Sequence, residues 1–453
     1  MKLKYFGTDG IRGLVGGPTM NEAFIRKFGI ALARYLRIRH PKGEVHLVIG
    51  RDTRESSEVF EKIIAEVVCP YGINVDILGV VPTPAVSFWV DELEGDNALM
   101  ITASHNDASY NGIKVFNGHG EKQLYDKEEM LEALIDEEVP QDELMNYKKC
   151  EYVFLQEAVQ GYVDNVLKAM PKGALKGWKI LLDCANGAAY ETSRLVFEAL
   201  GASLVLRGVS PDGKNINMDV GSEYPEAFVK AVQESGATIG IAHDGDGDRV
   251  IMCDEDGEIV PGDQLLGILA LHALAKGELA KKTFVATIQS NRGLDLAIEK
   301  AGGVVVRSNV GDRSLFQKME EVKSNIGGES SGHIIFADYS KTGDGLLAAI
   351  KVIEAMISTG RKLSDLRRDI LLLPQLTESL KIEEKRKMSE MVILDAAIKN
   401  LEASLGSEGR VLVRYSGTEP KIRLLVEGPD EETIARGMKA LKEAVHQELK
   451  VVV

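Results

Sequence analysis

Three aspartates occupy alternate positions in the segment His243–Arg249, which reads His-Asp-Gly-Asp-Gly-Asp-Arg. Carboxylate oxygens are the ligands that hard divalent cations prefer, and the intervening glycines allow the backbone to turn around an ion. We therefore predict that Asp244, Asp246 and Asp248 bind a metal ion. Three carboxylates leave coordination positions open for a phosphoryl oxygen, so the pattern favours phosphoryl transfer.

The same segment has a calcium-binding alternative, because Glu255 is the twelfth residue counted from Asp244, as in an EF-hand loop. The sixth residue, however, is Arg249, where that loop needs glycine for its sharp turn. The flanking segments 237–242 and 250–253 are apolar and predict strands, whereas an EF-hand loop lies between helices. A calcium-binding module is therefore a remote alternative.

A second reactive group is Ser104, in the run Thr102–Asn106 (Thr-Ala-Ser-His-Asn) directly after an apolar segment that ends at Ile101. A small polar residue in a loop at the end of a strand is well placed for chemistry. Downstream, Lys114 interrupts the apolar strand predicted around residues 111–116. Adjacent Ser and His are common in loops, so these residues alone do not indicate catalysis. They become candidates for catalysis because the same chain contains the predicted metal loop.

A third group lies in the segment Gly327–His333, which reads Gly-Gly-Glu-Ser-Ser-Gly-His. Gly328–Gly332 matches the G-x-S-x-G elbow of serine hydrolases, which must follow a strand and open a helix. Residues 334–336 are apolar and predict a second strand instead, so a serine hydrolase using Ser330 is also a remote alternative. Glu, Ser and His in a tight loop suit hydrogen bonding to sugar hydroxyls, and His333 can exchange protons.

Two further loops deliver arginines. In Arg414–Arg423 (Arg-Tyr-Ser-Gly-Thr-Glu-Pro-Lys-Ile-Arg), two guanidinium groups flank a Ser-Gly-Thr turn between predicted strands. Backbone N–H groups, hydroxyls and guanidinium forks form an anion site that fits a phosphate. The loop Tyr5–Gly13 is punctuated by glycines and carries Arg12.

The elements that position these loops recur along the chain. Segments 46–56, 179–190 and 283–294 each combine an apolar strand, a polar turn and a helix start, and a helical segment and a second strand follow each of them. Repeated strand–helix–strand units predict parallel strands with helices on both faces. We therefore expect an α/β fold with three similar domains, whose mixed sheets are sandwiched by helices.

The last part of the chain has a different pattern. It predicts a strand at 375–382, a helix at 389–405, strands at 410–415 and 421–427, and a final amphipathic helix. This pattern is typical of a smaller α+β domain. The expected domain ranges are 1–150, 151–255, 256–370 and 371–453.

Bulk composition limits the classes of partner. The 453 residues carry 54 Lys plus Arg and 69 Asp plus Glu, a net charge of −15, which disfavours a general nucleic-acid binder. No apolar signal core follows the N-terminus, and no apolar run is long enough to span a membrane. The four cysteines have no metal-ligand spacing, as expected for reduced thiols in a cytoplasmic protein.

Taken together, the loops resemble those of the α-D-phosphohexomutase family over essentially the whole chain and in the family's order. The serine loop is similar to Thr102–Asn106, the metal loop to Asp244–Arg249, the sugar loop to Gly328–His333 and the phosphate loop to Arg414–Arg423. The resemblance implies four domains around a central cleft. It also implies a small phosphosugar substrate, bound Mg²⁺, a sugar 1,6-bisphosphate as activator and a possible homodimer.

The resemblance assigns a role to each site residue. Ser104 would be the phosphoserine, and Asp244, Asp246 and Asp248 would hold Mg²⁺ together with an oxygen of that phosphoserine. The groups around the transferring phosphate and the acid–base candidates would be Arg12, Lys114, Arg249 and His333. The residues that bind the sugar and its other phosphate would be His105, Glu329, Ser331, Arg414, Ser416, Gly417, Thr418 and Arg423.

The implied reaction interconverts glucosamine 6-phosphate and glucosamine 1-phosphate through the phosphoserine and a sugar 1,6-bisphosphate. Three parts of the sequence are similar to the corresponding segments in the branch of the family that acts on glucosamine phosphates. They are Tyr5–Gly13, Gly187 and Thr342–Gly345. Ser330 departs from the pattern, since that branch usually has Gln and the glucose and mannose branch usually has Met at this position. Glucose or mannose phosphates are therefore the alternative substrates.

Overall fold

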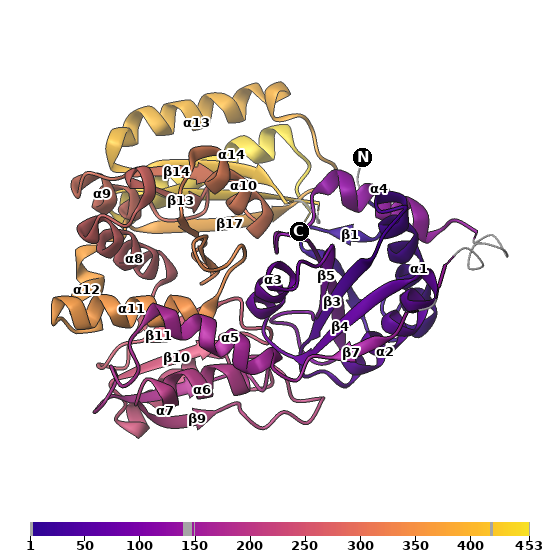
Figure 1. Ribbon diagram of the computed structural model, residues 1–453. Coiled ribbons are helices and arrows are strands. Elements are labelled where there is room, and N and C mark those ends of the chain that lie inside the picture. Colours follow the sequence, from indigo (N-terminus) through magenta and orange to yellow (C-terminus); the bar gives the residue numbers. More distant parts are fainter. Residues whose placement is uncertain (1–2, 139–146, 149, 417–419, 453) are drawn as a thin grey trace.

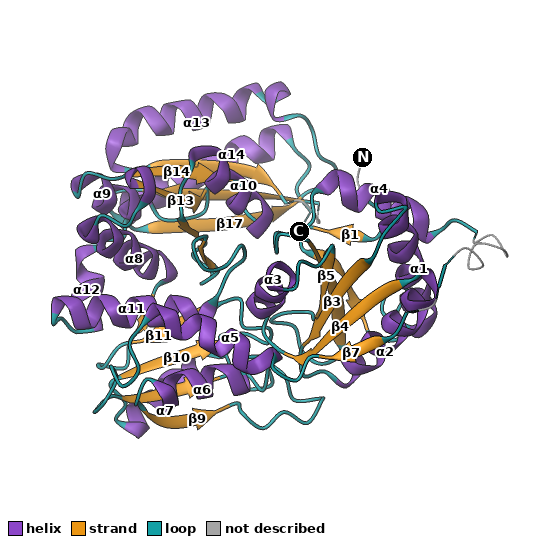
Figure 2. Cartoon of the chain, in the orientation of Figure 1, coloured by secondary structure: helices purple, strands orange, loops and turns teal. Residues whose placement is uncertain are grey.

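The computed structural model describes residues 3–138, 147–148, 150–416 and 420–452. Within these residues the strands form four sheets, of seven, five, four and three strands. Each sheet belongs to one consecutive part of the chain, as the colours in Figure 1 show, and helices accompany every sheet (Figure 2). The described chain is thus built from four successive units.

The first three sheets contain the same four-strand pattern. In the first sheet the spatial order is β4-β3-β5-β6, in which β3, β4 and β5 are parallel and β6 is antiparallel to β5. The second sheet repeats this order as β9-β8-β10-β11, and the third repeats it as β14-β13-β15-β16. The twelve strands are β3 (Val45–Arg51), β4 (Ile73–Val80), β5 (Asn97–Ile101), β6 (Tyr110–Asn117), β8 (Lys179–Asp183), β9 (Ser203–Arg207), β10 (Ile239–His243), β11 (Val250–Cys253), β13 (Thr283–Thr287), β14 (Val304–Ser308), β15 (Ile326–Gly328) and β16 (Ile334–Phe336). The prediction of three similar α/β domains with mixed sheets is therefore confirmed.

Short strands extend the first two sheets, and helices cover both faces of the sheets. The added strands are β1 (Phe6–Gly7), β2 (Gly10–Leu14), β7 (Tyr152–Phe154) and β12 (Ile259–Val260). The helices of these three domains are α1 (Glu22–Arg39), α2 (Glu55–Val68), α3 (Thr83–Glu92), α4 (Tyr125–Ile135), α5 (Ala158–Val166), α6 (Tyr190–Ala199), α7 (Pro225–Ser235), α8 (Gly262–Lys276), α9 (Arg292–Lys300), α10 (Asp312–Val322), α11 (Gly345–Thr359) and α12 (Leu363–Leu366).

Alternation along the strands divides the apolar side chains between different cores. In β3, Leu47 and Ile49 face a core with α1 and α2, whereas Val48 faces the opposite side of the sheet. The second and third sheets also bury one face in a small core of their own, against α7 and α10 respectively. The other face of all three sheets joins one continuous core, lined by α3, α5, α6, α8, α9 and α11. Because side chains alternate across a strand, one face of each sheet packs in a core of its own domain and the other face packs in the core that the three domains share. The shared core fixes the three domains relative to one another.

The fourth sheet is antiparallel, with β19 (Lys421–Glu427) between β17 (Gln375–Lys381) and β18 (Arg410–Tyr415). The helices α13 (Val392–Leu405) and α14 (Glu431–Glu448) pack with it around a separate core. The predicted smaller C-terminal α+β domain is confirmed. The domain limits proposed from the sequence stay a prediction.

None of the helices in the described residues is long and apolar enough to cross a bilayer. No disulfide joins the four cysteines, all of which lie within the described part of the chain.

A buried polar contact links the second and third domains. The hydroxyl of Tyr162, in α5, donates to Asp344 Oδ2 at 2.8 Å, and Asp344 Oδ1 accepts from Leu347 N at the start of α11. Both side chains are buried. Burial raises the pKa of Asp344 to about 6, although the hydrogen bonds from Leu347 and Tyr162 oppose this rise. The carboxyl of Asp344 is therefore ionised in the folded protein only above that pH.

We expect Tyr162→Phe to lower the thermal midpoint more at pH 8 than at pH 5. At pH 8 the lost hydrogen bond is to an ionised carboxylate and is worth about 1.5–3 kcal/mol, whereas a bond to the neutral acid is worth about 0.5–1.5 kcal/mol. The sign agrees with linkage, since the variant raises the folded-state pKa of Asp344 further and so loses stability as pH rises. Calorimetry at both pH values measures the difference, with Tyr152→Phe on the exposed strand β7 as control. Equal losses at the two pH values would contradict this account.

Candidate active site

Three equivalent hairpin loops meet at one place. In each α/β domain the loop lies between the third parallel strand and the antiparallel strand that follows it: β5–β6, β10–β11 and β15–β16. The first loop carries Ser104, the second carries the three aspartates, and the third carries Glu329, Ser331 and His333. Ser104 bonds to Asp244, and Arg249 and His333 form an antiparallel bridge. The repeated fold thus brings three separate sequence motifs together.

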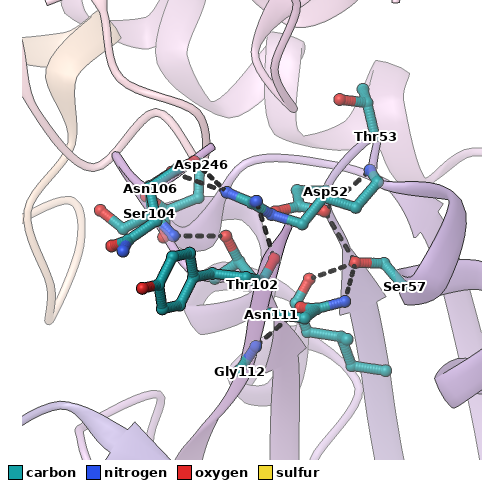
Figure 3. A network of polar contacts seen from close by, with 12 residues as sticks. Asp52, Thr53, Ser57, Thr102, Ser104, Asn106, Asn111, Gly112 and Asp246 are labelled. Atoms are coloured by element: carbon teal, nitrogen blue, oxygen red, sulfur yellow. Dashed lines mark hydrogen bonds and ion pairs between the residues drawn. The ribbon is translucent and has the colours of Figure 1, made fainter. Parts of the chain in front are cut away.

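Ser104 is buried and strained. Its Oγ donates to Asp244 Oδ2 at 2.7 Å. Its backbone N donates to Thr102 Oγ1 at 2.9 Å (Figure 3). Its φ of +52° lies in the left-handed region, which costs a residue with a Cβ about 1 kcal/mol or more. The surrounding contacts must therefore hold the loop in this conformation.

The aspartates of the second loop form a compact group of buried carboxylates. Asp244, Asp246 and Asp248 each offer an oxygen within 4.8 Å of the others. Burial, followed by the charges of Asp246 and Asp248, raises the pKa of Asp244 well above its usual value. Asp246 Oδ1 and Asp248 Oδ1 are buried and have no hydrogen-bond partner among the described residues. Orphaned, mutually repelling carboxylate oxygens fit a divalent cation, so these residues could hold a metal ion.

A glycine allows the metal loop to approach the serine loop. A Cβ placed on Gly245 would lie 2.5 Å from the carbonyl oxygen of Ser104, which is closer than side chains tolerate. Any larger residue at this position would push the two loops apart. The glycine between two aspartates therefore allows the two loops to pack closely, in addition to allowing the chain to turn.

Lys114 is buried among carboxylates from two domains. Its Nζ lies 2.7 Å from Asp246 Oδ2, 2.8 Å from Asp248 Oδ2 and 3.3 Å from Asp9 Oδ2. Burial alone disfavours the ammonium, but the carboxylates raise the pKa of Lys114 well above its usual value. Burial would likewise raise the pKa of Asp248, yet Lys114, His333 and Arg249 hold it well below its usual range. Lys114 is thus charged in this arrangement.

The remaining basic side chains surround the same point. Arg12 lies 3.1 Å from Asp9 Oδ2 through Nη2 and donates through Nη1 to Asn106 Oδ1 at 3.4 Å. Arg249 Nη1 lies 3.4 Å from His105 Nδ1. Burial, and then the charge of Arg249, lower the pKa of His105. Positively charged side chains therefore lie beside the carboxylates around Ser104.

His333 has both ring nitrogens engaged. Its Nε2 accepts from Gly343 N at 3.2 Å, and its Nδ1 lies 3.8 Å from Asp248 Oδ1. Burial by itself lowers the pKa of His333, but the Asp248 carboxylate raises it above its usual value overall. The ring is therefore held in one orientation beside the carboxylate group.

The third loop joins two strands and has no helix after it. Gly328–Gly332 is followed by β16, so the nucleophile elbow of a hydrolase is excluded at Ser330. Glu329 is held by its Oε1, which accepts from Gly311 N at 2.9 Å, and Ser330 and Ser331 are exposed. In the same way, β10 and β11 flank the aspartates, which excludes the helix–loop–helix of an EF-hand.

The arginines of the C-terminal loop lie on neighbouring strands. Arg414 of β18 and Arg423 of β19 are directly opposite one another, and this proximity, after burial, lowers the pKa of Arg414. Arg423 Nε is buried without a hydrogen-bond partner among the described residues. Ser416 is buried, and its carbonyl accepts from Lys385 at 2.5 Å. The predicted Gly417 and Thr418 lie outside the described residues. No hydrogen bond or ion pair within the described ranges joins Arg414 or Arg423 to the three hairpin loops.

The sequence interpretation missed several residues that support this site. Asp9 bonds to Arg12, Lys114 and Lys122, and Thr83 donates to Asp246 Oδ2 at 2.5 Å. Arg54 and Asn217 both bond to the backbone of the serine loop. Asp9 lies in a segment that the sequence predicts to be a loop, and Arg54 lies in a predicted strand–turn–helix segment. In the sequence, only the charge of these two residues suggested a role. Charge alone does not identify partners that are far away along the chain.

Comparison with known proteins identifies relatives along the whole chain. Family models for the phosphoglucomutase/phosphomannomutase α/β/α domains I, II and III match residues 3–142, 160–257 and 261–372. The model for the C-terminal domain of the same family matches residues 379–444. The curated phosphoglucosamine mutase of Syntrophotalea carbinolica is 39% identical over 453 residues, covering 100% of this chain and 99% of that protein. The phosphoglucosamine mutase of Lactococcus lactis subsp. lactis is 40% identical, covering 99% of each.

Solved structures share the fold at lower identity. A phosphoglucomutase/phosphomannomutase family protein from Burkholderia thailandensis has a TM-score of 0.78 at 23% identity, covering 98% of each chain. An N-acetylphosphoglucosamine mutase from Aspergillus fumigatus, in complex with GlcNAc-6P and magnesium, has a TM-score of 0.68 at 18% identity. It covers 98% of this chain and 96% of that one.

We expect Mg²⁺ to raise the thermal midpoint of the protein. An ion that binds only the folded state stabilises it by about 2.7 kcal/mol at a concentration of 100 times its Kd. Asp246→Asn should reduce this gain because it removes one of three ligand charges, and a chelator should reverse the gain in the unsubstituted protein. Asp256→Asn, in the nearby turn after β11, is the matched control. The assignment fails if both variants respond to Mg²⁺ like the unsubstituted protein.

Proposed function

Because the chain belongs to the phosphoglucomutase/phosphomannomutase family, we propose that it is a phosphoglucosamine mutase, which interconverts glucosamine 6-phosphate and glucosamine 1-phosphate. The observation that carries the proposal is the 2.7 Å contact of Ser104 Oγ with Asp244 inside the buried carboxylate group. It supports a serine that carries a phosphoryl group beside a Mg²⁺ site made by Asp244, Asp246 and Asp248.

In the first step, phospho-Ser104 gives its phosphoryl group to the free hydroxyl of a sugar monophosphate. The bond from phosphorus to Ser104 Oγ breaks, the bond to the sugar oxygen forms, and the sugar hydroxyl proton ends on Ser104 Oγ through a base. His333 is the candidate base. Lys114, which carries its proton, is a candidate proton shuttle that can donate to the Ser104 oxygen as the bond to phosphorus breaks. A bound Mg²⁺ would offset negative charge on the transferring group, to which Arg12 and Arg249 add fixed positive charge.

In the second step, the sugar 1,6-bisphosphate reorients and returns its other phosphoryl group to Ser104. The phosphate that is not being transferred needs a second anion site, and Arg414, Ser416 and Arg423 supply candidate groups. The buried Nε of Arg423, which has no hydrogen-bond partner in the part of the chain that the structure describes, supports this assignment. Gly417 and Thr418 belong to the same proposed loop.

The substrate assignment rests on the relatives. The curated proteins that match over the full length are named phosphoglucosamine mutases. Ser330, at the exposed tip of the third loop, lies between the proposed sugar-binding residues Glu329 and Ser331. Glucose and mannose phosphates are the alternative substrates for the same mechanism.

The proposed enzyme is cytoplasmic, uses a sugar 1,6-bisphosphate as activator and acts on small phosphosugars without a nucleic-acid or membrane partner. The predicted homodimer can be tested by measuring the oligomeric state in a sedimentation experiment.

A side-by-side mutase assay tests the function. With Mg²⁺ and a catalytic amount of bisphosphate, we expect kcat/KM for glucosamine 6-phosphate to exceed the values for glucose 1-phosphate and mannose 1-phosphate. A preference for glucose or mannose would overturn the substrate and leave the mechanism. No turnover of any of the three sugars would overturn the function.

Ser104→Ala should reduce mutase turnover to below about one part in 10⁴, because the group that carries the phosphoryl is gone. Its thermal midpoint should change little, since one hydroxyl contributes about 1 kcal/mol. Intact-mass analysis should show a phosphate increment in the unsubstituted protein that maps to Ser104 and is absent from the variant. Substantial turnover by the alanine variant would refute the phosphoserine mechanism.

Arg414→Ala should raise KM by roughly 10- to 100-fold, since a charge-assisted bond to phosphate is lost while the transferring groups stay in place. Steady-state kinetics measure the change, and Arg436→Ala on the exposed surface of α14 is the control from the same domain. An unchanged KM in Arg414→Ala would remove the phosphate-site assignment.

A further inference from the structure

The guanidinium of Arg54 is buried against the loop that carries Ser104. Arg54 directly precedes α2 and is 1% exposed. Its Nη2 donates to the carbonyls of Asn106 at 2.7 Å and Ser104 at 3.2 Å, and its Nη1 donates to the carbonyl of Tyr110 at 2.9 Å and to that of Asp107. One side chain therefore binds four backbone carbonyls between residues 104 and 110.

These carbonyls need partners. Tyr110 begins β6, but the carbonyls of Ser104, Asn106 and Asp107 belong to the loop between β5 and β6, which forms no helix or strand of its own and has no regular ladder to satisfy them. Of these three, the carbonyl of Asp107 also accepts from Tyr110 N. The left-handed backbone of Ser104 adds a conformational cost. If Arg54 were absent, the loop would relax toward conformations that satisfy its carbonyls with water. Ser104 Oγ would then move away from Asp244.

Arg54 is itself held in place. Its Nε donates to Asp52 Oδ2 at 2.7 Å, and Asp52 Oδ1 accepts from Arg54 N at 3.0 Å. Asp52 Oδ1 also accepts from Ser57 Oγ at 2.7 Å (Figure 3). Asn111 Nδ2, on β6, donates to Ser57 Oγ at 3.0 Å. The carboxylate of Asp52 neutralises the guanidinium, so Arg54 contributes geometry more than net charge. The network ties the serine loop to the strand ends that flank it.

The second domain holds the same carbonyls from the other side. Asn217 Nδ2 donates to Ser104 O and to Asn106 O, both at 2.8 Å. Arg54 and Asn217 therefore share two acceptors, although they belong to different domains. This arrangement couples the position of the serine to the docking of the domain that supplies the aspartates.

We propose that Arg54 is a positioning residue for phosphoryl transfer, which holds the Ser104 loop in its strained conformation, with Asn217 as its partner from the second domain. The proposal rests on the phosphoserine mechanism proposed above. Arg54 has no hydrogen bond to Ser104 Oγ among the described contacts, and it acts through the backbone. Its loss should therefore affect the transfer step and leave substrate binding intact.

The test is Arg54→Lys, which keeps the charge but cannot form the planar fork. We expect kcat to fall by about 100-fold, the size of effect that small misplacements of reacting groups produce, with KM nearly unchanged. Labelled phosphoryl on Ser104 should also be lost to water in a larger share than in the unsubstituted enzyme.

Arg37→Lys is the matched control. Arg37, in α1, is also buried and also donates to backbone carbonyls, at 2.7 Å to Tyr71 and 3.1 Å to Gly43, outside the three active-site loops. Both variants should lose stability, but Arg37→Lys should keep kcat per folded molecule. Equal kcat losses in the two variants, or a rise in KM without loss of kcat in Arg54→Lys, would overturn the proposal.

A second variant protects the test against misfolding of Arg54→Lys. Asn217 has a φ of +56°, so Asn217→Gly removes its side chain without backbone strain. We expect kcat to fall by about 10-fold with KM unchanged, and an unchanged kcat would count against the proposal. An unsubstituted protein without mutase turnover would instead contradict the proposed function, so the two failures are distinguishable.

Discussion

The repulsion among three buried carboxylates is the constraint on which the site depends. Asp244, Asp246 and Asp248 come within 4.8 Å of one another in a buried loop of the second domain. Like charges at this distance in a poorly hydrated interior are costly unless positive charge compensates them. The first domain supplies part of that compensation through Lys114, and it also supplies Ser104. Docking of the two domains therefore brings the Ser104 hydroxyl to the carboxylates and at the same time offsets part of their charge.

The repeated architecture explains why this docking is reproducible. Each α/β domain places its functional loop in the same hairpin, after the third parallel strand of its sheet. One face of every sheet joins a core shared by all three domains. Interiors are close-packed and resist sliding, so loops at the ends of these strands keep their relative positions. Sites built on rigid elements hold their geometry better than sites on long free loops. The C-terminal domain has its own core and reaches the third domain through polar contacts, such as that of Arg410 with the carbonyls of Ile288 and Ser290.

Local patterns in the sequence predicted the features that depend on interactions between residues close together in the chain. The spacing of Asp244, Asp246 and Asp248 identified a candidate metal loop, and the strands expected at 410–415 and 421–427 are those of the structure. Composition alone left the role of Ser104 ambiguous, and its assignment as the phosphoserine comes from the family resemblance and stays a prediction. Arg54 and Asn217 escaped notice because their partners are backbone carbonyls, which carry no sequence signal, and 113 residues separate Asn217 from Ser104. Asp9 was missed for a similar reason. It forms ion pairs with three cationic side chains that lie close together only in the folded chain.

A single turnover of enzyme labelled on Ser104 tests the phosphoserine mechanism most directly. Protein carrying a radioactive phosphoryl group at Ser104 would be mixed with excess unlabelled glucosamine 6-phosphate and Mg²⁺, and the reaction quenched on the millisecond scale. We expect the label to leave the protein and to appear first in a sugar 1,6-bisphosphate, then in sugar monophosphate. Label that stays on the protein while product accumulates, or that is released only as inorganic phosphate, would contradict this mechanism.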